Sequence, residues 1–145
     1  MDNSSNKLRD IGILFLRISV GLIFIIVHGI GKITAGPEMW TQLGGSMSIF
    51  GITFLPTFWG FMAAFTEFFV PMFLIIGLFY RPAALLLAFN MIVAAGFHFS
   101  RLDPWAKIEY PFLLVILFIS MFLIGPGRYS VDEYIKSRKL KKNEV

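Results

Sequence analysis

The chain has no cysteine and few charged residues. Its 145 residues include only 2 histidines, and 15% of the residues are charged, against about 25% in ordinary soluble domains. Without cysteine there can be no disulfide, thiolate metal site or Cys-x-x-Cys redox pair. The net charge of +4 comes without any interleaving of basic and aromatic residues. The sequence therefore gives no indication of nucleic-acid binding.

Apolar residues are abundant instead. They make up 57% of the chain, and phenylalanine alone occurs 17 times. A soluble domain of this size could not bury so much apolar surface. The composition therefore predicts an integral membrane protein, and the length predicts a single domain over residues 1–145.

Long apolar runs predict the transmembrane helices. Crossing a bilayer takes roughly 20 apolar residues in a helix, and we predict such helices over residues 11–31, 55–79, 82–99 and 106–125. The first run is too long for a cleaved signal peptide and is followed by no Ala-x-Ala site, so we interpret it as a retained helix. We expect Tyr80-Arg81-Pro82 to be a tight turn. The predicted fold is an all-α, antiparallel four-helix membrane bundle.

The loop between the first two spans contains a helical pattern. Pro37 can begin a helix there, and Trp40, Leu43 and Met47 recur at helical spacing with a break expected near Gly44-Gly45. This predicts a short amphipathic helix at the membrane surface. It would either cover helix ends or gate a site.

A second short helix is predicted after the last span. Ser130-Val131-Asp132-Glu133 has the spacing of a capping box, which indicates the start of a juxtamembrane helix within the basic tail 128–145. The tail either enforces topology or contacts anionic lipid.

The basic residues predict the orientation. With an even number of spans, both termini share a side. That side carries Lys7, Arg9, Arg81, Arg128, Lys136, Arg138, Lys139, Lys141 and Lys142, and the other carries Lys32, Arg101 and Lys107. The positive-inside rule therefore places both termini in the cytoplasm.

Two charged residues fall deep in the predicted spans. A charge at the bilayer centre costs roughly 2.5–3.5 kcal/mol, so we expect Arg17 and Glu67 to form an ion pair with Asn90 nearby. Pro71 frees the carbonyl of Glu67 from its helical hydrogen bond. The trio either takes part in function or only holds the bundle together.

A polar cluster is expected at the non-cytoplasmic ends of the spans. His28 and Lys32 are one helical turn apart and share a face. A candidate ligand or proton site comprises His28, Lys32, Glu67, Asn90, His98 and Glu109. Two histidines could ligate a metal or a haem, but no ligand spacing supports this and we predict no metal site. A proton relay, or a site for a quinone headgroup or an anion, is favoured.

Four stretches resemble a known family. They are LRISVGLIFIIVHGIGK (16–32), AFTEFFVPMFLIIGLFYRPAALLLAFNM (64–91), EYPFLL (109–114) and GPGRYSVDE (125–133). In their order and spacing the chain resembles the DoxX family of DoxX/DoxD-like four-helix bacterial membrane proteins. The resemblance implies an inner-membrane location and association with redox systems, including a thiosulfate:quinone oxidoreductase.

The resemblance also points to particular residues. Carried over to this chain, the family pattern indicates His28, Lys32, Glu67, Asn90 and Glu109. The chain departs from the pattern after Glu67, where Phe68-Phe69-Val70-Pro71 stands in place of small, glycine-rich packing.

Three functions follow as hypotheses. The favoured one is a membrane subunit of a redox-associated complex that offers a quinone or proton-handling site to a partner oxidoreductase. Without cysteine or a dinucleotide-binding motif, the chain could act in an enzyme only as such a subunit. The alternatives are a small-solute or proton transporter and a ligand-free membrane scaffold. Homo-oligomers are compatible with all three, and of the two cofactors a quinone is favoured over haem.

Overall fold

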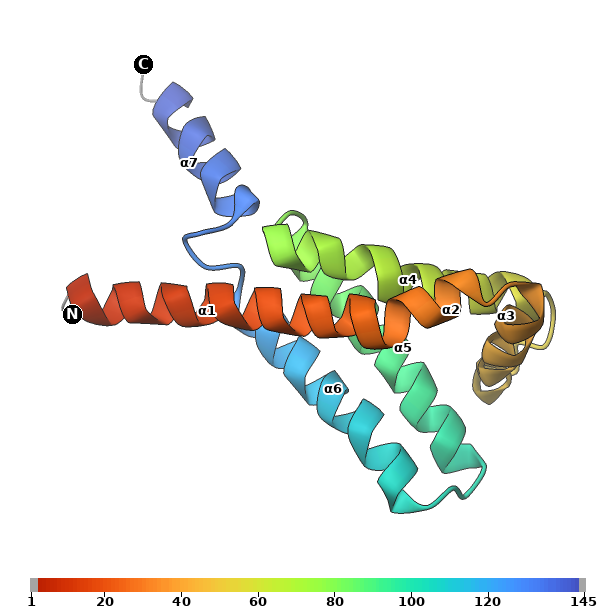
Figure 1. The fold of residues 1–145 in the computed structure, drawn as a ribbon. Helices are drawn as coiled ribbons and strands as arrows, with labels where there is room; N and C mark the ends of the chain where they lie inside the picture. Colours follow the sequence, from red (N-terminus) through yellow and green to blue (C-terminus); the bar gives the residue numbers. More distant parts are fainter. Residues whose placement is uncertain (1–2, 144–145) are drawn as a thin grey trace.

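The computed structural model describes residues 3–143, and most of them are helical (Figure 1). The elements are α1 (Asn3–Ile23), a π-helical turn η1 (Phe24–Gly29), α2 (Ile30–Thr34), α3 (Pro37–Gly44), a 3-10 segment η2 (Gly45–Phe50), α4 (Pro56–Ile76), α5 (Tyr80–Ser100), α6 (Trp105–Ile124) and α7 (Val131–Asn143). The described residues contain no β-strand, which confirms the predicted all-α class. Positions 1–2 and 144–145 of the predicted domain and tail lie outside the described residues.

Four helical stretches are long and apolar enough to cross a membrane, as predicted. They cover Asn6–Thr34, Pro56–Ile76, Tyr80–Ser100 and Trp105–Ile124. The turn expected at Tyr80-Arg81-Pro82 is displaced, because α4 already ends at Ile76 and residues 77–79 make the connection. The proline lies instead in the first turn of α5, where its missing N–H has no helical partner to lose.

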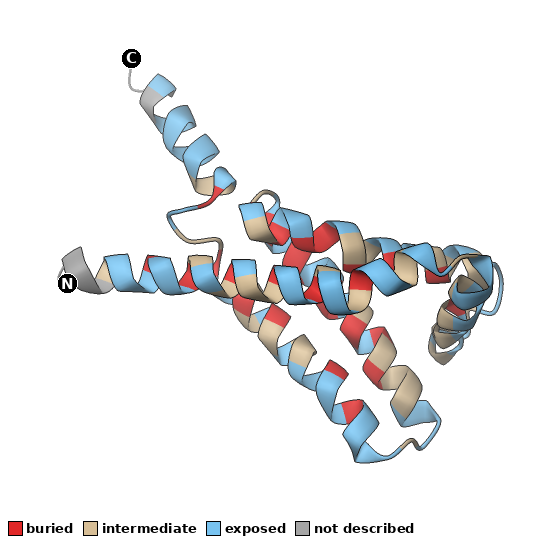
Figure 2. Cartoon of the chain, in the orientation of Figure 1, coloured by how far each residue is buried: buried red, intermediate tan, exposed pale blue. Residues whose placement is uncertain are grey.

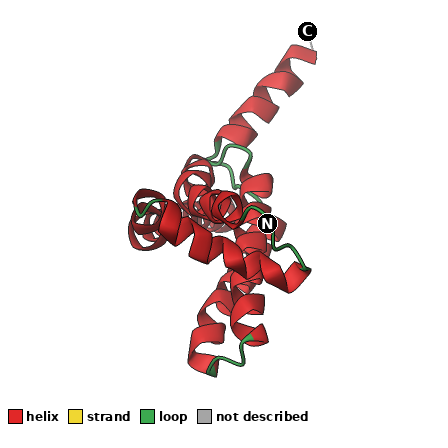
Figure 3. Ribbon diagram, turned by 90° about the vertical axis from the view of Figure 1, so that its right-hand side faces the viewer, coloured by secondary structure: helices red, strands yellow, loops and turns green. Residues whose placement is uncertain are grey.

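The spanning helices are arranged as two pairs. The rod formed by α1, η1 and α2 lies along α4, and α5 lies along α6 (Figure 1). Contacts between α4 and α5 join the pairs, which diverge away from the α4–α5 turn (Figures 1 and 3). The largest fully buried apolar side chains, Tyr80, Phe24, Phe118, Leu74, Leu87 and Met121, lie where the pairs meet. We call the end with the α4–α5 turn the turn end and the opposite end the loop end.

Apolar side chains also cover the outside of the helices. In Figure 2 the buried positions follow the sides on which helices face each other, and exposed positions run along the outer sides. Many exposed residues are large and apolar, including Phe15 at 71%, Leu123 at 69% and Leu113 at 61% exposure. In water such a surface would be unfavourable, whereas in a bilayer it faces hydrocarbon.

At the loop end, α3 packs tightly against the first turns of α4. A Cβ atom built on Gly60 would lie 1.6 Å from the carbonyl oxygen of Trp40, and one on Gly44 would lie 1.7 Å from that of Pro56. The indole of Trp40 donates a hydrogen bond to the carbonyl of Lys32, which ties α3 to α2. The predicted short helix and its break are confirmed, since α3 ends at Gly44 and η2 begins at Gly45.

Arg17 organises the turn end. Its side chain is 1% exposed. Its guanidinium donates hydrogen bonds to the carbonyl oxygens of Leu74 (3.1 Å), Ile75 (2.6 Å), Pro126 (2.8 Å) and Tyr129 (3.0 Å). Leu74 and Ile75 belong to the last turn of α4, whose carbonyls have no partner within the helix. One buried cation therefore caps α4 and holds the segment that follows α6.

The prediction of an ion pair between Arg17 and Glu67 is wrong, because each side chain has other partners. The carbonyl of Leu74, which accepts a hydrogen bond from Arg17, lies two helical turns beyond Glu67, about 10 Å along α4. A guanidinium presents five donors in a fork, and the free carbonyls at the helix end match them without a carboxylate.

The first turn of α7 is held against the α4–α5 turn. Both carboxylate oxygens of Asp132 accept hydrogen bonds, one from the backbone N–H of Phe79 (3.0 Å) and one from that of Tyr80 (2.9 Å). These donors belong to the free N-terminus of α5. The hydroxyl of Ser130 accepts a hydrogen bond from the N–H of Glu133 (3.2 Å), which confirms the predicted helix start.

The close packing of α3 on α4 makes Gly60 intolerant of a methyl group. We expect Gly60→Ala to lower the free energy of unfolding by about 1–3 kcal/mol or more, because Cβ would meet backbone rather than a movable side chain. Gly31→Ala is the matched control, since its Cβ meets nothing within 4 Å. Thermal unfolding in detergent measures both, and equal midpoints would contradict the packing.

Arg17→Met should destabilise the protein far more than Arg138→Met. The first change leaves buried carbonyl groups without a hydrogen-bond donor, and each such group lowers the free energy of unfolding by about 1–3 kcal/mol. Arg138, in contrast, is exposed on α7. Unfolding in a denaturing detergent titration would give the comparison. A small, equal loss in the two variants would mean that the guanidinium does not hold the turn end.

Candidate functional site

Glu67 lies at the centre of a buried polar cluster that three helices build. Its side chain on α4 is 3% exposed. One carboxylate oxygen, Oε2, accepts a hydrogen bond from Lys32 Nζ of α2 at 2.5 Å, and the other, Oε1, accepts one from Asn90 Nδ2 of α5 at 2.8 Å. Each oxygen of the carboxylate thus has a partner, one of them a cation, which offsets the cost of burying the charge.

A glycine and a proline allow the first helix to approach this cluster. A Cβ atom built on Gly29 would lie 2.8 Å from the carbonyl oxygen of Glu67, so only glycine permits the observed contact. Pro71 has no N–H to donate to that carbonyl. The π-helical turn Phe24–Gly29 lies at the same level, and such wide turns are frequent at functional sites.

His28 projects from the π-helical turn towards α6 rather than α4. Its Nε2 shares a hydrogen bond of 2.8 Å with the hydroxyl of Tyr110. The two rings are also stacked, with centroids 5.6 Å apart. The ring of Phe24 is a second aromatic neighbour of His28, with centroids 5.1 Å apart. The histidine and Lys32 therefore have partners on different helices.

Two cavities adjoin the buried cluster. The larger has a volume of about 580 Å³ and is lined by Lys32, Met39, Gln42, Leu43, Ser46, Ala63, Glu67, Asn90, Val93, Ala94, Phe97, His98 and Arg101. The smaller has a volume of about 330 Å³ and is lined by His28, Lys32, Glu67, Met91, Ala94, His98, Ala106, Lys107, Tyr110 and Pro111. The ion pair of Lys32 and Glu67 lines both cavities, so it stands at their common wall.

Each cavity reaches the molecular surface at the loop end. Met39, Gln42 and Arg101 are exposed at the larger one, and Lys107 and Tyr110 are exposed at the smaller one. A polar centre is thus accessible through walls that are largely apolar.

His98 is oriented by the connection between α5 and α6. Its Nδ1 lies 2.8 Å from a carboxylate oxygen of Asp103. This hydrogen bond lowers the pKa of the Asp103 carboxyl, so the aspartate stays ionised to lower pH. The ring of His98 lines both cavities at the loop end.

The structure brings together most of the residues that the sequence nominated. His28, Lys32, Glu67, Asn90 and His98 line one or both cavities. Glu109 does not: it is exposed and lies outside both sets of lining residues. Successive residues of a helix point about 100° apart. On α6 the residue after Glu109, Tyr110, therefore lines the smaller cavity. Whether the assembled residues bind a ligand or carry a proton stays a prediction.

Sequence reasoning missed several site residues. The candidate set from the sequence includes none of Tyr110, Gln42 and Asp103, although Tyr110 and Gln42 line the cavities and Asp103 bonds His98. The position of Tyr110 one residue after a nominated glutamate was the available signal. No sequence signal indicated that Gln42 would line a cavity or that Asp103 would form a hydrogen bond with His98.

Comparison with known proteins identifies relatives of this chain. The DoxX family profile matches residues 12–100. "Putative oxidoreductase CatD" of Bacillus subtilis (strain 168) is 28% identical over 130 residues, which cover 90% of this chain and 91% of the relative. "Inner membrane protein YqjF" of Escherichia coli (strain K12) is 28% identical over 137 residues, or 91% and 98% of the two chains. No solved structure matches.

The Lys32–Glu67 pair should behave non-additively. We expect Lys32→Met alone to lower the free energy of unfolding by about 3 kcal/mol, because it leaves a buried carboxylate without its cation. Glu67→Gln in the same background should restore most of that loss. A double-mutant cycle in detergent measures the coupling. Additive losses would show that the two side chains do not interact in the folded protein.

Proposed function

The chain belongs to the DoxX family, and from this premise we propose that it is a membrane subunit of a redox-associated complex. In this role the cluster of Lys32, Glu67 and Asn90 binds the headgroup of a quinone and handles its protons. A partner oxidoreductase exchanges the electrons. The name of the Bacillus subtilis relative, "Putative oxidoreductase CatD", supports the redox association.

The observation that carries this proposal is the pair of cavities that meet at a buried ion pair. A quinone is a flat apolar ring with two carbonyl oxygens and an apolar tail. The larger cavity offers apolar walls from Leu43, Val93 and Phe97, with Asn90 and Lys32 as hydrogen-bond donors. Apolar walls combined with placed polar groups are typical of sites for such molecules, and this cavity has both. The residues present therefore fit the group.

The chain's own side chains would hold the ligand and move protons. The ammonium of Lys32 has three N–H donors and gives one to Glu67, which leaves donors for a headgroup oxygen. Glu67 can hold or release a proton beside that oxygen, and Asn90 keeps the carboxylate in place. A bound quinone would supply two-electron, two-proton chemistry. The His28–Tyr110 pair lines the smaller cavity and offers a second route for the proton.

The proposal includes a partner and an orientation. The chain has no cysteine and only 2 histidines, so the electrons must come from another protein. The positive-inside rule places both termini in the cytoplasm, and the cavities then open on the opposite side of an inner membrane. The name of the Escherichia coli relative, "Inner membrane protein YqjF", supports an inner-membrane location.

A transporter is the competing function. Cavities that reach the surface at the loop end, with an ion pair at their inner wall, would also suit a small solute or a proton. A ligand-free scaffold fits less well. Arg17 and Glu67 have separate partners, and the space beside Glu67 has no role in a scaffold.

Quinone binding is tested on the full chain purified in mild detergent. Co-purified quinone is extracted and identified, and a short-chain ubiquinone analogue is titrated while tryptophan fluorescence is recorded. We expect Glu67→Gln and Asn90→Leu each to weaken the affinity about tenfold or more, the effect of losing one hydrogen bond near a charge. Glu109→Gln is the matched control, because that glutamate is exposed and lies outside both cavities.

Two results would contradict the proposal. One is protein that neither carries quinone nor responds to the analogue. The other is equal weakening by Glu67→Gln and Glu109→Gln. Proton or solute flux in proteoliposomes that depends on Glu67, without quinone binding, would establish the transporter instead.

A further inference from the structure

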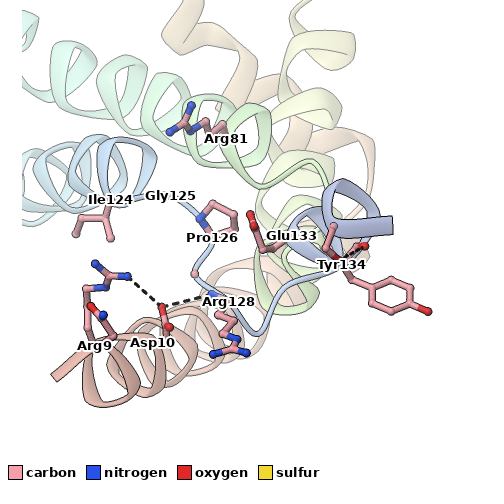
Figure 4. Close-up of a pocket in the computed structure, with 12 residues that line it drawn as sticks. Arg9, Asp10, Arg81, Ile124, Gly125, Pro126, Arg128, Glu133 and Tyr134 are labelled. Carbon is pink, nitrogen blue, oxygen red and sulfur yellow. Dashed lines mark hydrogen bonds and ion pairs between the residues drawn. The ribbon is translucent and has the colours of Figure 1, made fainter. Parts of the chain in front are cut away.

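A third cavity lies at the turn end, on the opposite side of the molecule from the ion pair of Lys32 and Glu67. It has a volume of about 740 Å³, the largest of the three (Figure 4). Its lining residues are Asn6, Arg9, Asp10, Arg81, Ile124, Gly125, Pro126, Gly127, Arg128, Glu133, Tyr134 and Ser137. The lining includes three arginines from three separate parts of the chain: α1, α5 and the segment after α6 (Figure 4).

The charges around this cavity do not balance. Asp10 is 7% exposed, lies 3.7 Å from a guanidinium nitrogen of Arg9 and accepts a hydrogen bond from the backbone N–H of Arg128. Glu133 lies 3.9 Å from the ammonium of Lys136. Both carboxylates thus have cationic or N–H partners. Within residues 3–143, the side chains of Arg81 and Arg128 have no carboxylate within 4 Å, so the cavity carries surplus positive charge.

The surplus charge lies where the spans end. Arg81 is the second residue of α5, and Ile124 is the last residue of α6. The guanidinium of Arg81 lies 5.7 Å from the ring centre of Phe122, which keeps its apolar stem beside α6. Arginine at this level faces the layer that contains the phosphate groups of lipids.

We propose that this cavity binds the phosphodiester headgroup of an anionic phospholipid. The planar fork of arginine suits two phosphate oxygens at once. Arg81 and Arg128 supply such forks from different segments, while Ile124 and Pro126 provide an apolar wall for the start of an acyl chain. The proposal is independent of the quinone site, because the two sites share no residue.

Lipid binding here would add a contact among three parts of the chain that meet at the turn end. The segment 125–130 already attaches to α1 through Arg17 and Asp10. A headgroup between Arg81 and Arg128 would add α5 to this assembly. The first turns of α7 line the same cavity, so the basic helix α7 would be fixed at the membrane surface.

The test is a direct binding measurement on the full chain in phosphatidylcholine nanodiscs. Fluorescent phosphatidylglycerol is titrated, and its dissociation constant is compared between variants. We expect the double variant Arg81→Gln/Arg128→Gln to bind about 30-fold more weakly, the factor for two lost cationic contacts. The control Arg138→Gln/Lys139→Gln removes the same charge from exposed positions of α7 and should change binding by less than about threefold.

Additional measurements distinguish a lipid phosphate from free phosphate and cover the case in which the double variant does not fold. Unlabelled phosphatidylglycerol should displace the probe, whereas phosphatidylcholine and 10 mM inorganic phosphate should not. If the double variant does not fold, Arg81→Gln alone should weaken binding about fivefold. Equal weakening in the two double variants would overturn the proposal in favour of diffuse attraction. Displacement by inorganic phosphate would overturn it in favour of a free-anion site.

Discussion

The ion pair between Lys32 and Glu67 is the interaction on which the loop end of the molecule depends. A carboxylate in a membrane-spanning helix is costly unless a cation and hydrogen-bond donors reach it. Meeting that requirement brings α2 against the middle of α4 and α5 against the same point through Asn90. Gly29 permits the approach, since any larger residue would strike the backbone of α4. Both cavities of the proposed quinone site form around this contact.

At the turn end, the buried charge of Arg17 is stabilised in a different way. Within residues 3–143 its guanidinium forms no ion pair with a carboxylate, and it is surrounded by backbone carbonyls of α4 and of the segment after α6. Asp132 completes the arrangement by capping α5. The two ends therefore differ in character. Side-chain to backbone bonds hold the turn end together, whereas side-chain to side-chain bonds join Glu67 to α2 and α5 towards the loop end. Ligand chemistry is expected at the loop end, and lipid contact at the turn end.

Much of this architecture could be predicted from the sequence because it follows from local rules. Span length and apolar composition predicted four crossing helices, and Pro37, Gly44-Gly45 and Ser130 predicted where the short helices begin or break. The rise per residue gave the polar residues their depth along each span. This placed Glu67 and Asn90 together and nominated Lys32 within the same six-residue candidate site, but it paired Glu67 with Arg17. The structure joins Lys32 and Asn90 to Glu67 instead.

What the sequence by itself determined was which helices carry the polar residues and roughly where along each helix they lie. The tertiary structure decided which of them meet. Arg17 bonds carbonyls rather than Glu67, and Tyr110 rather than Glu109 enters the site. The physical reason is direction around the helix axis. One residue turns a side chain by about 100°, so the π-helical turn at Phe24–Gly29 and the way the helices pack select the partner. Periodicity within a single helix does not contain that information.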